Sequence, residues 1–189
     1  PEECSDINKT PLSDSDFAAR TSVLISKNKA NVLQLLIQLS TSEDKQTSAA
    51  VLDCLNSWIT EIPITKILST ASLYQLIFNN LLHEQNFDLS IEALISIIKE
   101  TQDIENLDLI SDLYQELIKL KPLLFENFES FEIVRGLTRL FVEIGECWNA
   151  SIIKNPEYFK DLIEILLKCC EFKDDLDVIR LTFNFWDLS

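Results

Sequence analysis

Glycine is nearly absent from this chain, with two residues among 189, and this shortage limits the folds that the chain can form. An average protein contains roughly 7% glycine. β-Sandwiches and barrels need turn residues at short intervals, and nucleotide-binding α/β folds need glycine-rich phosphate loops. Proline is also scarce, with five residues, while hydrophobic residues make up 47% of the chain. The composition therefore argues against those classes and predicts helices that bury a large apolar core.

Apolar residues recur at helical spacing along most of the chain. We expect the first helix to bend or break at the polar segment 26–29. The expected N-caps are Ser15 or Asp16, a residue of the turn 41–44, Ser69, Asp88, Asn155 with Pro156 at the first helical position, and Asp174. The predicted helices cover residues 14–40, 44–61, 69–85, 88–101, 104–120, 128–153, 155–171 and 174 onward. They form four antiparallel pairs over residues 14–62, 64–101, 104–153 and 155–189.

The second helices of these pairs resemble one another. Trp58, Ile97, Leu140 and Trp186 fall in register at intervals of 39, 43 and 46 residues. Tandem helix pairs of about 40–47 residues are typical of HEAT and armadillo arrays, whereas tetratricopeptide units have about 34. The sequence therefore predicts an all-α, α-α superhelix of the HEAT/armadillo-like solenoid type. Trp58 and Trp186 are expected to pack between repeats, and the alternative is an aromatic anchor on the concave face.

The formal net charge of the chain is −15. Nucleic acids and anionic membranes attract clustered Lys and Arg, so we expect the chain to bind neither directly. Complementary charge favours a basic protein partner, and a merely solvated acidic surface is the alternative. No apolar run reaches the roughly 20 residues that span a bilayer.

Few residues are suited to catalysis. The five cysteines form no C-x-x-C pair, and four of them fall in apolar helical stretches, which is typical of reduced thiols in an intracellular protein. His83 is the only histidine, and no nucleophile motif surrounds it. The adjacent Cys169 and Cys170 point to different sides of a helix, which argues against a shared metal site. We expect no enzyme activity, no metal and no cofactor.

Three segments together resemble the karyopherin-β nuclear transport receptors. Residues 52–59 read Leu-Asp-Cys-Leu-Asn-Ser-Trp-Ile, residues 137–146 read Leu-Thr-Arg-Leu-Phe-Val-Glu-Ile-Gly-Glu, and residues 179–186 read Ile-Arg-Leu-Thr-Phe-Asn-Phe-Trp. Each motif alone is weak, but the ordered set covers nearly the whole chain. It resembles the transportin-SR group, and within it the fungal receptors that import shuttling messenger-RNA-binding proteins. Asp187 departs from the group, where an aromatic residue often stands.

The resemblance implies a function. It implies a HEAT-repeat receptor that shuttles between nucleus and cytoplasm with basic, Arg/Ser- or Arg/Gly-rich cargo. Ran-GTP would release the cargo, and Phe-Gly nucleoporins would bind the outer surface. Both terminal helix pairs lack a polar outer face, so we expect a segment of a longer solenoid. The alternative is a HEAT-repeat scaffold or regulatory subunit unrelated to transport.

Two groups of residues are candidates for partner binding. Acidic side chains near the second helices would form an inner surface for Ran or cargo, and solvated helix surface is the alternative. A shallow groove between two first helices would take a nucleoporin Phe ring, unless its residues prove fully buried in the core. The acidic candidates are Glu92, Glu132, Glu143, Glu146, Asp174 and Asp175, and the groove candidates are Tyr74, Phe78, Leu109 and Tyr114.

Overall fold

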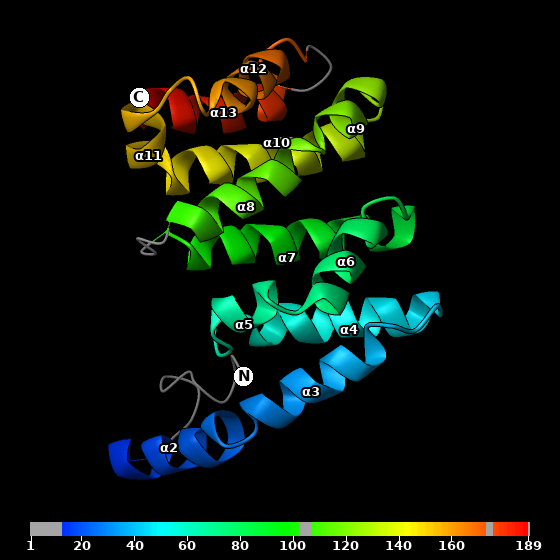
Figure 1. The fold of residues 1–189 in the computed structure, drawn as a ribbon, viewed down its shortest axis with the longest axis vertical. Coiled ribbons are helices and arrows are strands. Elements are labelled where there is room, and N and C mark those ends of the chain that lie inside the picture. The colour runs from blue at the N-terminus through cyan, green and yellow to red at the C-terminus, as the bar shows by residue number, and fades with distance from the viewer. Residues whose placement is uncertain (1–12, 103–106, 173–175, 189) are drawn as a thin grey trace. The chain divides into compact units, whose positions relative to one another are not determined.

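The computed structural model describes residues 13–102, 107–172 and 176–188, and the regular elements in these ranges are all helical (Figure 1). The chain divides into two compact units, Pro1–Ile97 and Ile98–Ser189. The predicted all-α class is confirmed, and tandem helix pairs of this kind are the building blocks of HEAT-like solenoids. The limits of the four pairs, 14–62, 64–101, 104–153 and 155–189, stay a prediction.

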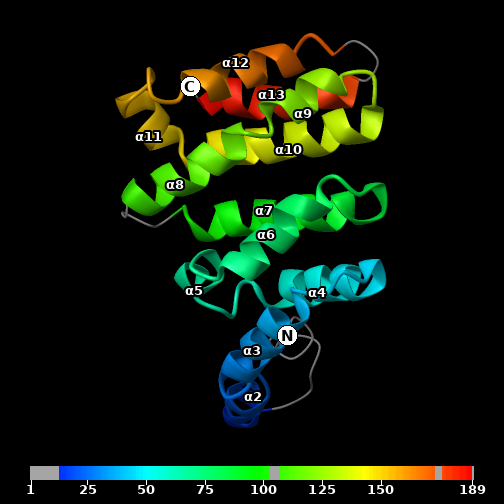
Figure 2. The ribbon, with the colours of Figure 1, turned by 45° about the vertical axis from the view of Figure 1, so that its right-hand side comes forward.

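In the first unit α4 packs against α3 and α6, and α6 also packs against α3 and α5 (Figures 1 and 2). The last turn of α7 belongs to the second unit. The elements are α2 (Asp14–Thr21), a π-helical turn (Ser22–Ser26), α3 (Lys29–Leu39), α4 (Lys45–Trp58), α5 (Ile64–Leu68), α6 (Ala71–Asn80), a 3-10 turn (Glu84–Asn86) and α7 (Phe87–Glu100).

The predicted interruption of the first helix is confirmed. A π-helical turn precedes residues 27 and 28, and α3 begins only at Lys29. The carboxamide of Asn28 donates hydrogen bonds to the carbonyls of Val23 at 2.8 Å and Leu24 at 3.3 Å. Asn28 therefore satisfies carbonyls at the end of the π-helical turn, which otherwise lack a helical partner. The N-cap of α2 is Ser13, two or three residues before the predicted Ser15 or Asp16.

The N-terminus of α4 is capped by the side chain of Asp44. The Asp44 carboxylate accepts hydrogen bonds from the Thr47 amide at 2.8 Å and the Thr47 hydroxyl at 2.7 Å. These bonds, with that of the hydroxyl the strongest, hold the pKa of Asp44 below its usual value. The buried side of α4 then follows helical spacing through Ser48, Val51, Leu52 and Leu55. A capping turn at 41–44 was predicted, and the structure places the cap at Asp44.

The second unit is organised by α10, which packs against α9, α11, α12 and α13. Both views show α12 and α13 alongside α10 (Figures 1 and 2). Its helices are α8 (Leu107–Ile118), α9 (Lys121–Glu126), α10 (Phe131–Cys147), α11 (Asn149–Lys154), α12 (Lys160–Cys169) and α13 (Leu176–Leu188).

α10 and α13 approach closely because of Gly145. A Cβ atom at this position would lie 2.5 Å from Cδ2 of Phe185, far inside van der Waals contact. Phe185 is 3% exposed, and the neighbouring α10 side chains Leu140, Phe141 and Ile144 are fully buried. Glycine at 145 therefore allows a phenylalanine ring of α13 to rest directly on the α10 backbone.

A buried tryptophan separates α10 from α11, so the helix predicted over 128–153 is two helices. Trp148 is 2% exposed, and its indole N–H donates to the Thr101 hydroxyl at 3.0 Å. Thr101 in turn donates to the carbonyl of Ile98 at 2.6 Å. Trp58 and Trp186, the two tryptophans expected to pack between repeats, are both half-buried.

Three other predicted helix starts were wrong. Ser69 ends α5, and Thr70 precedes α6. Asp88 lies inside the first turn of α7 rather than before it. Asn155 and Pro156 begin a turn, and α12 starts only at Lys160. The predicted cap Asp174 lies outside the described residues.

Candidate partner-binding surfaces

Three of the acidic candidates lie on one face of α10. Glu132, Glu143 and Glu146 share this face with Arg135 and Arg139, because intervals of three and four residues bring side chains together on a helix. Glu132 and Arg135 are exposed, and the other three residues are half-buried. The face therefore carries mixed charge and is not the continuous acidic surface predicted from the sequence.

Glu143 is engaged within its own unit. It forms an ion pair with Lys99 at 3.5 Å and accepts a hydrogen bond from the Cys147 thiol at 3.5 Å. Burial, followed by the nearby charge of Glu143, raises the pKa of Cys147 to about 12. The thiol therefore stays protonated and donates to the carboxylate. Glu146 also interacts within the structure, which leaves Glu132 as the most accessible carboxylate of the three.

The remaining acidic candidates are not brought to this face. Glu92 is half-buried on α7, in the first unit, and it too interacts within the structure. Asp174 and Asp175 lie outside the described residues. The described carboxylate closest to them in sequence, Asp177, forms an ion pair with Arg180 at 3.3 Å on the exposed side of α13.

Tyr74 and Phe78 form a ring pair on α6. Their ring centroids lie 4.7 Å apart at an interplanar angle of 43°, and both side chains are half-buried. Four residues beyond Phe78, just after the end of α6, Leu82 is 72% exposed. Part of each ring is therefore accessible. An apolar ligand group could pack against the two rings.

Tyr114 lies in the core of the second unit, where it is 2% exposed. Its ring centroid is 4.8 Å from that of Phe159, 5.3 Å from that of Tyr158 and 6.4 Å from that of Trp148. Burial raises the pKa of Tyr114 to about 12. Tyr114 therefore offers no surface to a nucleoporin ring. Leu109 belongs to α8, and its side chain lies outside the described part of the structure.

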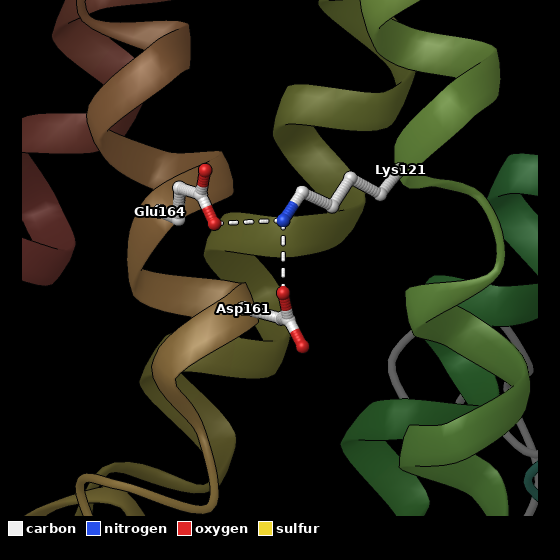
Figure 3. A network of polar contacts seen from close by, with 3 residues as sticks. All are labelled: Lys121, Asp161 and Glu164. Atoms are coloured by element: carbon white, nitrogen blue, oxygen red, sulfur yellow. Dashed lines mark hydrogen bonds and ion pairs between the residues drawn. The ribbon is translucent and has the colours of Figure 1, made fainter.

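Sequence reasoning missed a charged cluster that joins α9 to α12 (Figure 3). The Lys121 ammonium lies 2.8 Å from Asp161 Oδ1 and 2.7 Å from Glu164 Oε2. These two hydrogen bonds, that of Asp161 first, raise the pKa of Lys121. The only hint in the sequence was a pair of carboxylates three residues apart on one helix face. The cluster shows that some acidic residues of this chain already have a cation as partner.

The described residues contain no group of three or more His, Cys, Asp and Glu side chains that could hold a metal ion. His83 is exposed in the turn after α6. Within the described residues, no helix is both long and apolar enough to cross a membrane.

Two protein-family profiles match the chain. The profile described as "Transportin-3/Importin-13 second TPR domain" matches residues 129–188, which include α10 to α13. The profile described as "Exportin 1-like protein" matches residues 1–94. Tetratricopeptide and HEAT units are both tandem antiparallel helix pairs, so the first description agrees with the predicted architecture.

Curated relatives extend the similarity over nearly the whole chain. The mRNA transport regulator MTR10 of Saccharomyces cerevisiae is 36% identical over 98% of this chain and 21% of its own length. An uncharacterized protein of Schizosaccharomyces pombe is 34% identical over 98% of the chain and 20% of its own length. Importin-13 of Gallus gallus is 23% identical over 86% of the chain and 18% of its own length.

The chain thus spans about a fifth of the length of the relatives that it matches. The paired helices, the two profiles and these relatives agree with the resemblance in residues 52–59, 137–146 and 179–186. The chain belongs to the karyopherin-β family, in the group of transportin-3 and importin-13.

Proposed function

We propose that this chain is a protein-binding segment of a nuclear import receptor. The observation that carries the proposal is the 36% identity, over 98% of the chain, to a protein named mRNA transport regulator. In this role the receptor carries basic RNA-binding proteins through nuclear pores, shuttles between nucleus and cytoplasm, and releases its cargo when Ran-GTP binds. Cofactors and catalysis have no part in it.

The net charge of −15 supports a basic cargo. Complementary charge accelerates association and disfavours partners of the wrong sign. The proposed contacts are Glu92, Glu132, Glu143, Glu146, Asp174 and Asp175, and exposed Glu132 is the strongest of them. Since Glu143 already pairs with Lys99, a cargo cation would have to compete with that lysine.

Tyr74 and Phe78 support binding of Phe-Gly nucleoporins. The two rings are in contact and half-buried, which makes them a preorganised apolar surface on α6. Aromatic side chains in such positions often dominate binding energy. Because Tyr114 is buried, it is not part of the proposed surface, which consists of Tyr74, Phe78 and the exposed Leu82. Leu109 stays a prediction.

A pull-down with the full-length protein tests the proposal. An immobilised Arg/Ser-rich or Arg/Gly-rich cargo domain should retain the protein, and Ran-GTP should release it, whereas Ran-GDP should not. Phe-Gly repeats should retain the parent protein but not the Tyr74→Ala/Phe78→Ala variant, with Phe183→Ala on α13 as the matched control. Retention of cargo in the presence of Ran-GTP would instead favour a scaffold or regulatory subunit.

A further inference from the structure

The exposed turn between α3 and α4 contains a threonine that acidic residues follow two and three positions later. Thr41, Glu43 and Asp44 are all exposed. Protein kinases select substrates partly by charge pattern, and one class selects an acidic residue three positions after the acceptor hydroxyl. In the whole chain, the serines and threonines with a carboxylate at that distance are Ser13, Ser40 and Thr41.

The structure separates these three residues. Ser13 is the N-cap of α2, and its hydroxyl donates to the Asp16 carboxylate at 2.6 Å. The acceptor hydroxyl and the carboxylate that a kinase would bind therefore hold each other. Ser40 is 8% exposed, and its hydroxyl donates to the Ile37 carbonyl at 2.8 Å. Of the three, Thr41 alone is an exposed residue that leaves its directing carboxylate unbound.

The segment around Thr41 is also easy to open. A kinase must draw the acceptor hydroxyl into its active site, so the segment has to separate locally from the protein. α3, which precedes the turn, buries only Leu36, and segments with few buried apolar contacts open at low free energy. Asp44 accepts both of its hydrogen bonds from Thr47 through Oδ2. A basic group of a kinase can therefore bind Asp44 Oδ1 while the cap of α4 stays in place.

We propose that Thr41 is a phosphorylation site of an acid-directed serine/threonine kinase, and that the phosphate loosens the last turn of α3. The kinase transfers the γ-phosphoryl group of ATP to Thr41 Oγ1. The Oγ1–P bond forms, the bond between the γ-phosphorus and the ADP oxygen breaks, and the hydroxyl proton passes to the catalytic aspartate of the kinase. The inference goes beyond the proposed import role and does not depend on it.

The phosphate changes the end of α3 in two ways. Thr41 loses the proton that it donates to the Gln38 carbonyl at 3.2 Å. The phosphate also adds about 1.5–2 negative charges directly after Ser40, the C-cap of α3. The helix dipole already places partial negative charge at that end, so the added charge is unfavourable there. Both changes destabilise a helix that has only Leu36 buried.

The test incubates the full-length protein with a purified acid-directed kinase, ATP and Mg²⁺, and tandem mass spectrometry locates the phosphate over time. Thr41→Val removes the acceptor hydroxyl and keeps the shape of the side chain. Asp44→Asn removes the directing charge, while its carboxamide oxygen can still cap α4. The matched control is Asp16→Asn, which makes the same change three positions after Ser13.

We expect phosphate at Thr41 in the parent and none in the peptide around residue 41 of Thr41→Val. Asp44→Asn should slow phosphorylation by about tenfold, because a hydrogen bond to a charged group is lost, and Asp16→Asn should react at the parent rate. In the phosphorylated protein, amides in the last turn of α3 should exchange hydrogen about fivefold faster.

Three results would overturn the inference. They are phosphate at Ser13 or Ser40 instead of Thr41, an Asp44→Asn variant that reacts as fast as the parent, and unchanged hydrogen exchange in α3 after phosphorylation. Because the assay contains neither Ran nor cargo, its failure leaves the import proposal standing.

Discussion

α10 and α3 both show apolar residues at helical spacing, yet they differ in how much of that face is buried. α10 packs against four helices and buries nine residues. α3 packs against α4 and α6 and buries only Leu36. Leu35 and Leu39 of α3 remain 51% and 40% exposed. Spacing therefore identifies the helix face suited to burial, whereas the number of neighbouring helices decides how much of that face is buried.

The difference matters for function as well as stability. Segments with few buried apolar contacts open locally at lower free energy than a core. α3 leads into the exposed turn before α4, whereas α10 carries its charged face on a densely packed helix. We therefore expect α3 to open locally more readily than α10.

The largest expected effect is that of Phe141→Ala on α10. Phe141 is fully buried, and truncation of a buried Phe costs roughly 3–5 kcal/mol through lost contacts and a cavity. Hydrogen exchange followed by mass spectrometry should show faster exchange throughout α10, α12 and α13. The matched control is Phe183→Ala on α13, where the ring is 55% exposed and the cost should stay within about 0.5 kcal/mol. Equal losses of stability in the two variants would contradict the expected contrast between a ring buried on α10 and an exposed ring on α13.

Gly145→Ala should have a smaller effect of the same kind. The added methyl group would lie 2.5 Å from Cδ2 of Phe185, and insertion of a methyl group into a packed core costs about 1–3 kcal/mol. Thermal unfolding should occur at a lower temperature than in the parent. Phe185→Leu in the same chain shortens the opposing side chain and should recover part of the loss. A Gly145→Ala protein that unfolds like the parent would show that α10 and α13 are farther apart than the structure has them.

Sequence patterns predicted what depends on local chemistry. The scarcity of glycine predicted the all-α class, the polar segment 26–29 predicted the break before α3, and the turn 41–44 predicted the cap of α4. The patterns predicted the wrong helix limits where a contact between residues far apart in the sequence determines the structure. Trp148 interrupts the helix predicted over 128–153. Its indole N–H donates a hydrogen bond to the hydroxyl of Thr101, which is 47 residues away in the chain.

The candidate site shows the same limit. Helical spacing predicted that Tyr114 lies on a helix face suited to apolar contacts. Spacing alone does not show that the rings of Phe159 and Trp148 pack against the Tyr114 ring. The acidic candidates on α10 were expected to form a continuous surface, but Arg135 and Arg139 lie on the same helix face and interrupt it. No local pattern connects Lys121 with its partners Asp161 and Glu164, because they are about 40 residues away in the chain.

The smallest expected effect is that of Leu35→Ala on α3. Leu35 is 51% exposed, and a surface substitution of this kind should change the free energy of unfolding by at most about 0.5 kcal/mol. Leu36→Ala at the neighbouring position is the matched comparison, since Leu36 is 2% exposed and truncation of a buried Leu costs roughly 2–5 kcal/mol. Urea unfolding of the 189-residue chain measures both. If Leu35→Ala proved as costly as Leu36→Ala, the exposed side of α3 would have to be covered. α3 would then no longer differ clearly from α10 in how much of its apolar surface is buried.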